Sequence, residues 1–347
     1  MIPLANPLAG YLEHKEEIDK AVLKVLSNGS YILGEEVEIF EKSFAKYIGV
    51  KYCVGVASGT DALFLSMKAL EIGKGDEVIT VSHTAVATVA AIVMTGAKPV
   101  LIDIKPDDFT MDPEKIEKAI TKKTVGILPV HIYGNVCDMD EIYNKTYKHD
   151  LFVIEDCAQA AGASYSGSNV KGKVGSLGNV GCFSFYPTKN LGCFGDGGAI
   201  TMEANFDNKK LYEKLICLRQ YGWKKRYISE IHGYNSRLDE IQAAILNVKL
   251  KYLDKDNKKR RHAAMAYGPY YKFNPESVYH LYITRSDKRN SSIKSFTKLG
   301  LQTAIHYPVP IHLQPGYKDL VRVSGTMKET ERAAKEVLSL PMYPQLA

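Results

Sequence analysis

The sequence predicts an α/β protein built on a mostly parallel sheet that helices cover on both faces. Between residues 50 and 205, short apolar runs alternate with amphipathic stretches. The apolar runs show little polar alternation, as expected of strands buried on both faces of a parallel sheet. Beyond residue 205 the pattern becomes helical and then mixed. This second part predicts a smaller α+β region.

The strands and helices of the first part are predicted from the local sequence pattern of each segment. The expected strands cover residues 51–57, 76–82, 98–104, 124–134, 151–157 and 180–186. The expected helices cover residues 59–70, 84–96, 113–120 and 139–149. Pro113 fits the first position of the third helix, and Gly96 fits the end of the second.

The second part begins with the strongest helix signal of the chain, at residues 236–253, where Leu238, Ile241 and Ile245 recur at helical spacing. A strand at residues 278–285 and a helix at residues 291–300 follow, and then a proline-rich loop. The expected division is a large domain of residues 1–248 and a small C-terminal domain of residues 249–347.

Composition limits the class of protein. The 347 residues are 45% hydrophobic and 24% charged, as in ordinary globular proteins, and the net charge is +6. The basic run at residues 255–262 predicts a solvated helix face, because its charges lack the pattern of a nucleic-acid site. An anionic small-molecule substrate fits the mild positive charge better than nucleic acid does.

Six cysteines occur without a Cys-x-x-Cys pair or a zinc-like His/Cys spacing. We therefore expect free thiols, no metal site and a reducing cytoplasmic location. No signal-peptide pattern opens the chain and no apolar run is long enough for a membrane span, so neither is expected.

Three segments carry the candidate chemistry. Ser58-Gly59-Thr60 follows a strand and opens a helix, where free N–H groups bind phosphate; a plain N-cap is the alternative. Glu155 and Asp156 end a strand, at the sheet edge where α/β proteins bind ligands; Asp156 is the functional candidate and Glu155 the structural one.

The third segment is "SFYPTKNLGCFGDGGAI", residues 184–200. Ser184 can donate a hydroxyl to phosphate, and the glycines after Lys189 let the backbone fold closely around a ligand. An exposed hairpin lysine is the alternative. A phosphate cup, a strand-end acid and a lysine in a glycine-rich turn together are the groups that pyridoxal phosphate needs.

On these segments the chain resembles the pyridoxal-phosphate-dependent sugar aminotransferases of the DegT/DnrJ/EryC1/StrS group. Further matching text is "YILGEEVEIFEKSFAKYIG", "HTAVATVAAI", "PVHIYGNVCDMD", "VIEDCAQAAGA", "GYNSRLDEIQAAIL" and "AIHYPVPIHLQPGY". The resemblance implies fold type I of pyridoxal-phosphate enzymes, the aspartate-aminotransferase fold. It also implies a homodimer with shared active sites.

The resemblance implies a role for each matched residue. Lys189 forms an imine with the cofactor aldehyde, Asp156 pairs with the pyridine nitrogen, and Gln159 contacts the ring. The cofactor phosphate is held by Gly59, Thr60 and Ser184, and by Asn235 of the neighbouring subunit.

Other candidates depend on less specific text. Many members carry an aromatic residue where this chain has Ala85, so His83 is the expected stacking residue, with a core or N-cap histidine as the alternative. The substrate candidates are His306, His312, Tyr186 and Lys224. Loop packing is the alternative for both histidines, and a solvated loop for Lys224. The segment at 267–277 is shorter than usual for the group, and the chain stops sooner than many of its members do.

The expected activity is transfer of an amino group from L-glutamate to a nucleotide-linked ketosugar, favouring dTDP-3-keto-6-deoxyhexoses, for aminosugar biosynthesis. The cofactor would alternate between pyridoxal and pyridoxamine 5'-phosphate. The alternatives are a 4-keto sugar or another phosphorylated ketone as substrate, a sugar dehydratase, and a non-catalytic sensor on the same fold.

Overall fold

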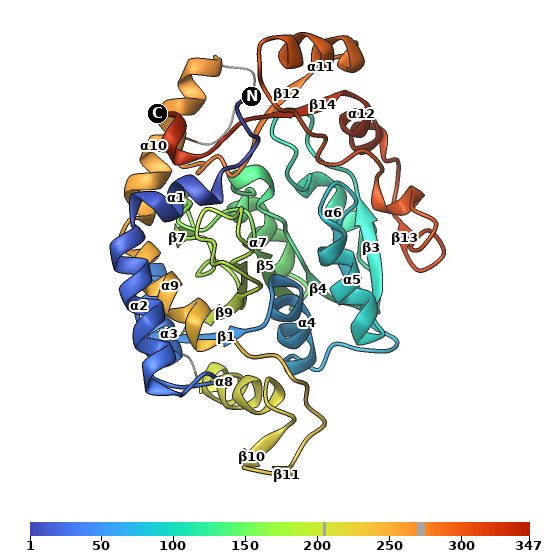
Figure 1. Cartoon of the computed structure of the whole chain (residues 1–347). Helices are drawn as coiled ribbons and strands as arrows, with labels where there is room; N and C mark the ends of the chain where they lie inside the picture. The colour runs from blue at the N-terminus through green and yellow to red at the C-terminus, as the bar shows by residue number, and fades with distance from the viewer. Residues whose placement is uncertain (204–205, 269–274) are drawn as a thin grey trace.

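The computed structural model describes residues 1–203, 206–268 and 275–347, and a mixed sheet of eight strands lies at its centre (Figure 1). All neighbouring strands are parallel except where β9 pairs with β1 and with β8. The predicted fold class is therefore confirmed. The strand order is β1 (Tyr52–Val56), β9 (Gly198–Met202), β8 (Val180–Ser184), β5 (Phe152–Asp156), β4 (Thr124–Ile127), β2 (Glu77–Val81), β3 (Lys98–Ile102) and β13 (Arg322–Val323).

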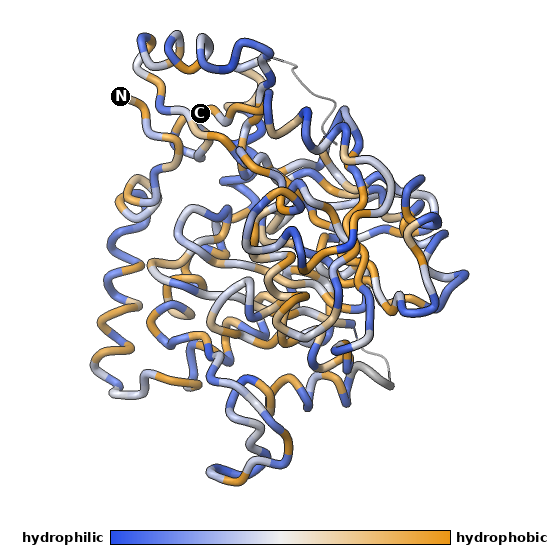
Figure 2. The backbone as a smooth tube through the Cα atoms, turned by 90° about the vertical axis from the view of Figure 1, so that its right-hand side faces the viewer, coloured by the Kyte–Doolittle hydropathy of each residue, from blue (hydrophilic) through white to orange (hydrophobic). Residues whose placement is uncertain are grey.

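Helices cover both faces of this sheet because successive residues of a strand point to opposite sides. In β8, the ring of Phe183 meets Phe44 of α3 (Glu35–Ile48) edge-on, with 4.9 Å between centroids. The next residue back, Cys182, has its sulfur 3.3 Å from the hydroxyl of Ser66 in α4 (Gly59–Ala69). Figure 2 shows many hydrophobic segments running through the middle of the molecule.

The remaining helices flank this core. α2 and α3 pack against α9, and α4 packs against α5. Their bounds are α1 (Pro7–Glu13), α2 (Lys15–Asn28), α5 (Val86–Thr95), α6 (Ile116–Ala119), α7 (Met139–Tyr147), α8 (Phe206–Leu218), α9 (Glu240–Leu250) and α10 (Leu253–Tyr267).

The C-terminal part forms a smaller unit around the antiparallel pair β12 (Tyr282–Arg285) and β14 (Val337–Leu340), with α11 (Arg289–Lys298) and α12 (Lys328–Glu336). Its short strand β13 returns to the edge of the main sheet beside β3. The predicted domain boundary at residues 248 and 249 falls inside α9, and it stays a prediction.

Several predicted elements are shorter in the structure. The strand expected at 124–134 ends at Ile127, because Pro129 has no N–H for the ladder and the chain then turns into the 3₁₀ segment Ile132–Gly134. The helix expected from residue 236 starts at Glu240. In α10 the predicted solvated face is only partly right, since Asn257 and Arg260 are buried. Much of the segment at 267–277 lies outside the described residues.

Two hairpins were not predicted: β6 (Ser164–Ser166) with β7 (Lys171–Lys173), and β10 (Trp223–Lys225) with β11 (Ile228–Ser229). The β10–β11 hairpin projects from the body in both views (Figures 1 and 2). Within the described ranges, no helix has the length and apolar character of a membrane span.

Candidate active site

Asp156 is a buried carboxylate at the carboxyl end of β5. Its Oδ2 accepts a hydrogen bond from the Thr88 hydroxyl at 2.8 Å, and its Oδ1 accepts one from the Ala158 N–H at 3.1 Å. Burial raises the pKa of Asp156, while the two hydrogen bonds and the charge of Lys189 act in the opposite direction. The group is thus held where a cationic ligand would favour its charged form.

Lys189 lies in the turn after β8, where its N–H donates to the carbonyl of Tyr186 at 2.8 Å. Burial lowers the pKa of its amine to about 8, and Asp156 partly opposes this. About half of such amines are neutral at pH 8, against roughly one in 300 for an ordinary lysine. The charges of Lys189 and Asp156 each affect the pKa of the other. Because a large fraction of the Lys189 amine is neutral, it can act as a nucleophile.

The hydroxyl of Thr88, which donates to Asp156, also forms a hydrogen bond with the hydroxyl of Thr84. The two threonine oxygens are 2.8 Å apart. Since the single proton of Thr88 goes to Asp156, Thr84 must donate to Thr88. Both residues lie in the "HTAVAT" text, at the start of α5. The two hydroxyls together therefore fix the orientation of Oδ2 of Asp156.

The start of α4 forms a cup with the ends of two neighbouring strands. Ser58 caps the helix by accepting from the N–H of Asp61 at 3.1 Å, so the predicted N-cap is present. A Cβ on Gly59 would lie 2.6 Å from Cβ of Ser184, and one on Gly198 would lie 2.3 Å from the carbonyl oxygen of Ser58. Only glycine allows this approach, which brings Ser184 beside the first N–H groups of the helix, including that of Thr60. Such a helix start attracts phosphate.

Gln159 is buried between two tyrosines. Its Oε1 accepts the N–H of Tyr133 at 2.7 Å, and its Nε2 donates to the Tyr307 hydroxyl at 3.0 Å. These contacts fix the plane of the amide three residues beyond Asp156. Gln159 and Asp156 therefore lie on the same turn, with defined orientations.

His83 is fully packed. Burial and, to a smaller extent, the positive charge of Arg285 lower the pKa of His83 to about 4, so the ring is neutral. The Tyr133 hydroxyl donates to the carbonyl of His306, so His83 Nε2 must carry the proton that it shares with Tyr133. Its ring also lies edge-on to that of Tyr307, with 6.4 Å between centroids. The core role left open by the sequence accounts for these contacts.

The two loop histidines differ. His306 Nδ1 lies 2.7 Å from the Ser339 hydroxyl, and burial and then the charge of Lys189 lower its pKa. The charge of Lys189 therefore acts on His306. His312 has both nitrogens occupied, Nδ1 by Ser82 at 2.8 Å and Nε2 by Glu331 at 3.4 Å. These contacts match the loop-packing alternative.

Three other candidates lie on exposed surface. Tyr186 precedes Lys189 by three positions and is 52% exposed. Lys224 lies in the projecting β10–β11 hairpin, where it pairs with Glu230 at 3.5 Å. Asn235 is exposed, while the hydroxyl of the next residue, Ser236, donates to Asp61 in the first turn of α4.

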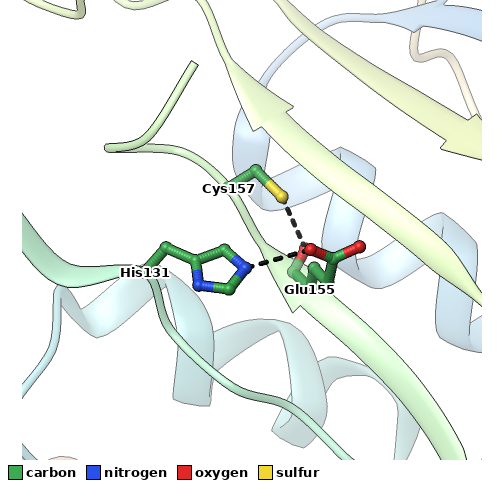
Figure 3. Close-up of side chains that lie close together, drawn as sticks. All are labelled: His131, Glu155 and Cys157. Carbon is green, nitrogen blue, oxygen red and sulfur yellow. Dashed lines mark hydrogen bonds and ion pairs between the residues drawn. The ribbon is translucent and has the colours of Figure 1, made fainter. Parts of the chain in front are cut away.

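Among the described residues, one group of potential metal ligands lies close together: His131, Glu155 and Cys157. Figure 3 shows the ring of His131 and the sulfur of Cys157 both directed at Glu155. The Glu155 carboxylate is already satisfied by three N–H groups of the 175–178 segment and by His131 Nε2, at 2.8–3.0 Å. Burial also raises the pKa of Cys157, so the thiol stays protonated. We read this cluster as structural, in line with the structural role expected for Glu155.

These residues fit pyridoxal phosphate. The α4 cup suits its phosphate, Asp156 suits the ring nitrogen, and the low-pKa amine of Lys189 suits its aldehyde. The sequence reasoning missed Thr88, Tyr133 and Tyr307 as supports of the site. The quoted texts "HTAVAT", "HIYG" and "IHYP" contain all three, but nothing in their spacing indicates these contacts.

Comparison with known proteins agrees with this arrangement. The model of the DegT/DnrJ/EryC1/StrS aminotransferase family matches residues 12–347. A dTDP-3-amino-3,6-dideoxy-α-D-galactopyranose transaminase of Aneurinibacillus thermoaerophilus is 45% identical, over 100% of this chain and 96% of the relative. The erythromycin biosynthesis sensory transduction protein EryC1 of Saccharopolyspora erythraea is 43% identical, over 100% and 95%.

The crystal structure of Streptomyces venezuelae DesV in complex with a ketimine intermediate is 42% identical, with a TM-score of 0.94. The match covers 100% of this chain and 94% of that one.

Proposed function

This chain belongs to the DegT/DnrJ/EryC1/StrS aminotransferase family, and on that basis we propose that it moves the amino group of L-glutamate to a nucleotide-linked ketosugar. The observation that carries the proposal is the pairing of a low-pKa lysine with a buried strand-end carboxylate beside a phosphate cup. Pyridoxal phosphate is the cofactor of this family.

When bound, the cofactor supplies a ring that accepts the electron pair left as the substrate loses its α proton. Asp156 would hold the ring nitrogen protonated, because its negative charge favours the charged form of the ring. Lys189, with its lowered pKa, would meet the cofactor aldehyde as a neutral amine, and the same amine would accept and donate the proton that the reaction moves. The α4 cup and Gln159 hold the cofactor in place.

For the acceptor we propose a dTDP-linked 3-keto-6-deoxyhexose, with a 4-keto sugar or another phosphorylated ketone as the alternative. The name of the A. thermoaerophilus relative, a 3-amino-sugar transaminase, supports the first choice. Lys189 argues against a dehydratase, in which a histidine would take its place. The name of EryC1 keeps a sensor as the second candidate.

The substrate residues stay proposals. We propose that His306 and Tyr186 meet the sugar or its diphosphate near Lys189. Lys224 projects away from its own site, so we assign it to the site of a partner subunit. His312 shapes the loop through its contacts with Ser82 and Glu331.

We propose a homodimer with shared sites. The N-terminal helices and the β10–β11 hairpin leave large apolar side chains exposed, which a second subunit would cover. These include Leu8, Leu12, Leu23, Leu26, Tyr227 and Ile228. The six unpaired thiols suit a reducing cytoplasm, where we place the reaction.

Hybrid dimers test whether Asn235 acts across the interface. Lys189→Ala and Asn235→Ala homodimers should both be impaired. In a hybrid, one site would regain Lys189 from one subunit and Asn235 from the other, so a random mixture should recover about a quarter of native activity. At equal total protein, activity no higher than the mean of the two homodimers would mean that Asn235 acts within its own subunit or not at all.

Replacing Thr88 by valine should raise the pKa of Asp156 and lower kcat by roughly ten- to a hundredfold, because a hydrogen bond to a charged group is lost. Thr80→Val is the matched control: its buried hydroxyl donates to the carbonyl of Leu128 at 2.8 Å and does not touch Asp156. The pH profile of kcat separates the two. Equal rates and profiles in both variants would contradict this role of Thr88.

Amino transfer itself is tested by incubating the purified protein, loaded with pyridoxal phosphate, with glutamate and a dTDP-3-keto-6-deoxyhexose. Mass spectrometry should detect both 2-oxoglutarate and the aminosugar nucleotide. Parallel reactions with 4-keto sugars rank the acceptors. Loss of water from the sugar without amine gain would indicate a dehydratase, and no turnover with any ketone would favour the sensor.

A further inference from the structure

The turn that carries Lys189 is anchored through the residue after it. Asn190 Nδ2 donates to Oδ1 of Asn257 at 2.8 Å and to the carbonyl of Val278 at 2.9 Å. Asn257 lies on α10 and is 1% exposed. Its own Nδ2 donates to the carbonyl of Ala161 at 3.0 Å. Ala161 belongs to the turn that begins at Asp156, so one side chain joins the two turns that carry the principal groups.

The geometry at Asn257 demands an amide. Ala161 offers an acceptor and needs a donor, whereas Asn190 offers a donor and needs an acceptor; an asparagine side chain supplies both. The Ala161 turn also passes very close. At Gly162, φ is +87° and a Cβ would lie 2.6 Å from Nδ2 of Asn257. There is no room for a side chain at position 162, and the Asn257 amide cannot turn over without losing both bonds.

We infer that Asn257 is a positioning residue that sets the Lys189 turn against the Asp156 turn. It touches neither group. The Lys189 amine is attached to this turn by a four-carbon side chain, so a shift of the turn shifts the region that the amine can reach. A misplacement of about 1 Å in a reacting group can cost about a hundredfold in rate. The inference rests on the proposed role of Lys189 as the residue that binds the cofactor.

The test compares Asn257→Leu with Asn257→Asp in the cofactor-loaded protein. N257L removes both hydrogen bonds at similar volume. We expect it to shift the pH midpoint of the visible cofactor band by at least about half a unit and to lower kcat by roughly ten- to a hundredfold. N257D keeps the acceptor for Asn190 but places a carboxylate oxygen against the Ala161 carbonyl. It should melt at a lower temperature than N257L yet keep a midpoint nearer to native.

Asn247→Leu on α9 is the matched control. Its Nδ2 donates to the carbonyl and to the carboxylate of Glu36, both at 3.0 Å, and these contacts do not involve the Lys189 turn. N247L should lose stability without a shift in the midpoint. If N257L does not fold, Asn257→Ser removes the same amide with a smaller side chain.

A native midpoint in N257L or N257S, or an equal shift in N247L, would overturn the inference. So would spectral shifts that follow melting temperature across all variants. If the native protein itself shows no titrating visible band, the proposed role of Lys189 fails first. If the native protein shows a titrating band and N257L has the same pH midpoint, only the role of Asn257 is contradicted.

Discussion

Lys189→Ala is expected to abolish covalent capture of pyridoxal phosphate, so that borohydride no longer fixes the cofactor to the protein. Loss of its proton transfer alone should lower kcat by roughly 10²–10⁴-fold. The variant should still fold, because the lysine amine lies in a site where burial opposes its charge and removing it relieves that cost. Spectra, borohydride trapping and turnover measure the three effects.

Lys249 supplies the control for this experiment. It too is a partly buried lysine, and desolvation of its amine lowers its pKa to about 8. Its amine, however, donates to the carbonyl of Gly192 and does not interact with Asp156. Lys249→Met should therefore retain borohydride trapping. If Lys249→Met lost the trapped cofactor and Lys189→Ala kept it, the wrong lysine has been assigned.

Asp156→Asn should lower kcat by about a thousandfold, because the negative charge that would hold the ring nitrogen protonated as the electron pair develops is lost. Asparagine keeps the shape but has one acceptor oxygen where Asp156 has two, so it keeps the hydrogen bond from either Thr88 or the Ala158 N–H and loses the other together with the charge. The absorbance of the bound cofactor should change with it, because the ring nitrogen is no longer held protonated.

Asp103→Asn is the comparison for Asp156→Asn. Asp103 is another buried carboxylate, which accepts the N–H groups of Glu329 and Thr330 at 2.9 and 2.8 Å. Its replacement should reduce the free energy of unfolding and leave the spectrum unchanged. A spectrum and rate close to native in Asp156→Asn would remove the carboxylate from the mechanism.

The parts predicted from sequence are those that local pattern and sheet geometry determine. Asp156 and Ser184 end neighbouring strands β5 and β8, so their meeting at one sheet edge follows from a parallel sheet. The N-cap at Ser58 follows from residue type and position. Lys189 was joined to Asp156 on other grounds, namely the set of groups that pyridoxal phosphate needs and the resemblance to the family.

The parts that sequence did not reveal depend on contacts between distant segments. Thr88 and Asp156 are 68 positions apart, and Asn190 and Asn257 are 67 apart. Threonine and asparagine occur throughout the chain, and their spacing carries no signal. The strand expected at 124–134 was too long because the apolar run conceals the effect of Pro129. β13 was missed because two residues are too few for a period.

Borohydride reduction followed by peptide analysis identifies the lysine that binds the cofactor. The native protein, loaded with pyridoxal phosphate and reduced with borohydride, is digested and its peptides are analysed by mass spectrometry. We expect a single pyridoxyl adduct on Lys189, in the peptide that continues into Asn190 and Leu191. An adduct on any other lysine, or none at all, would contradict this expectation.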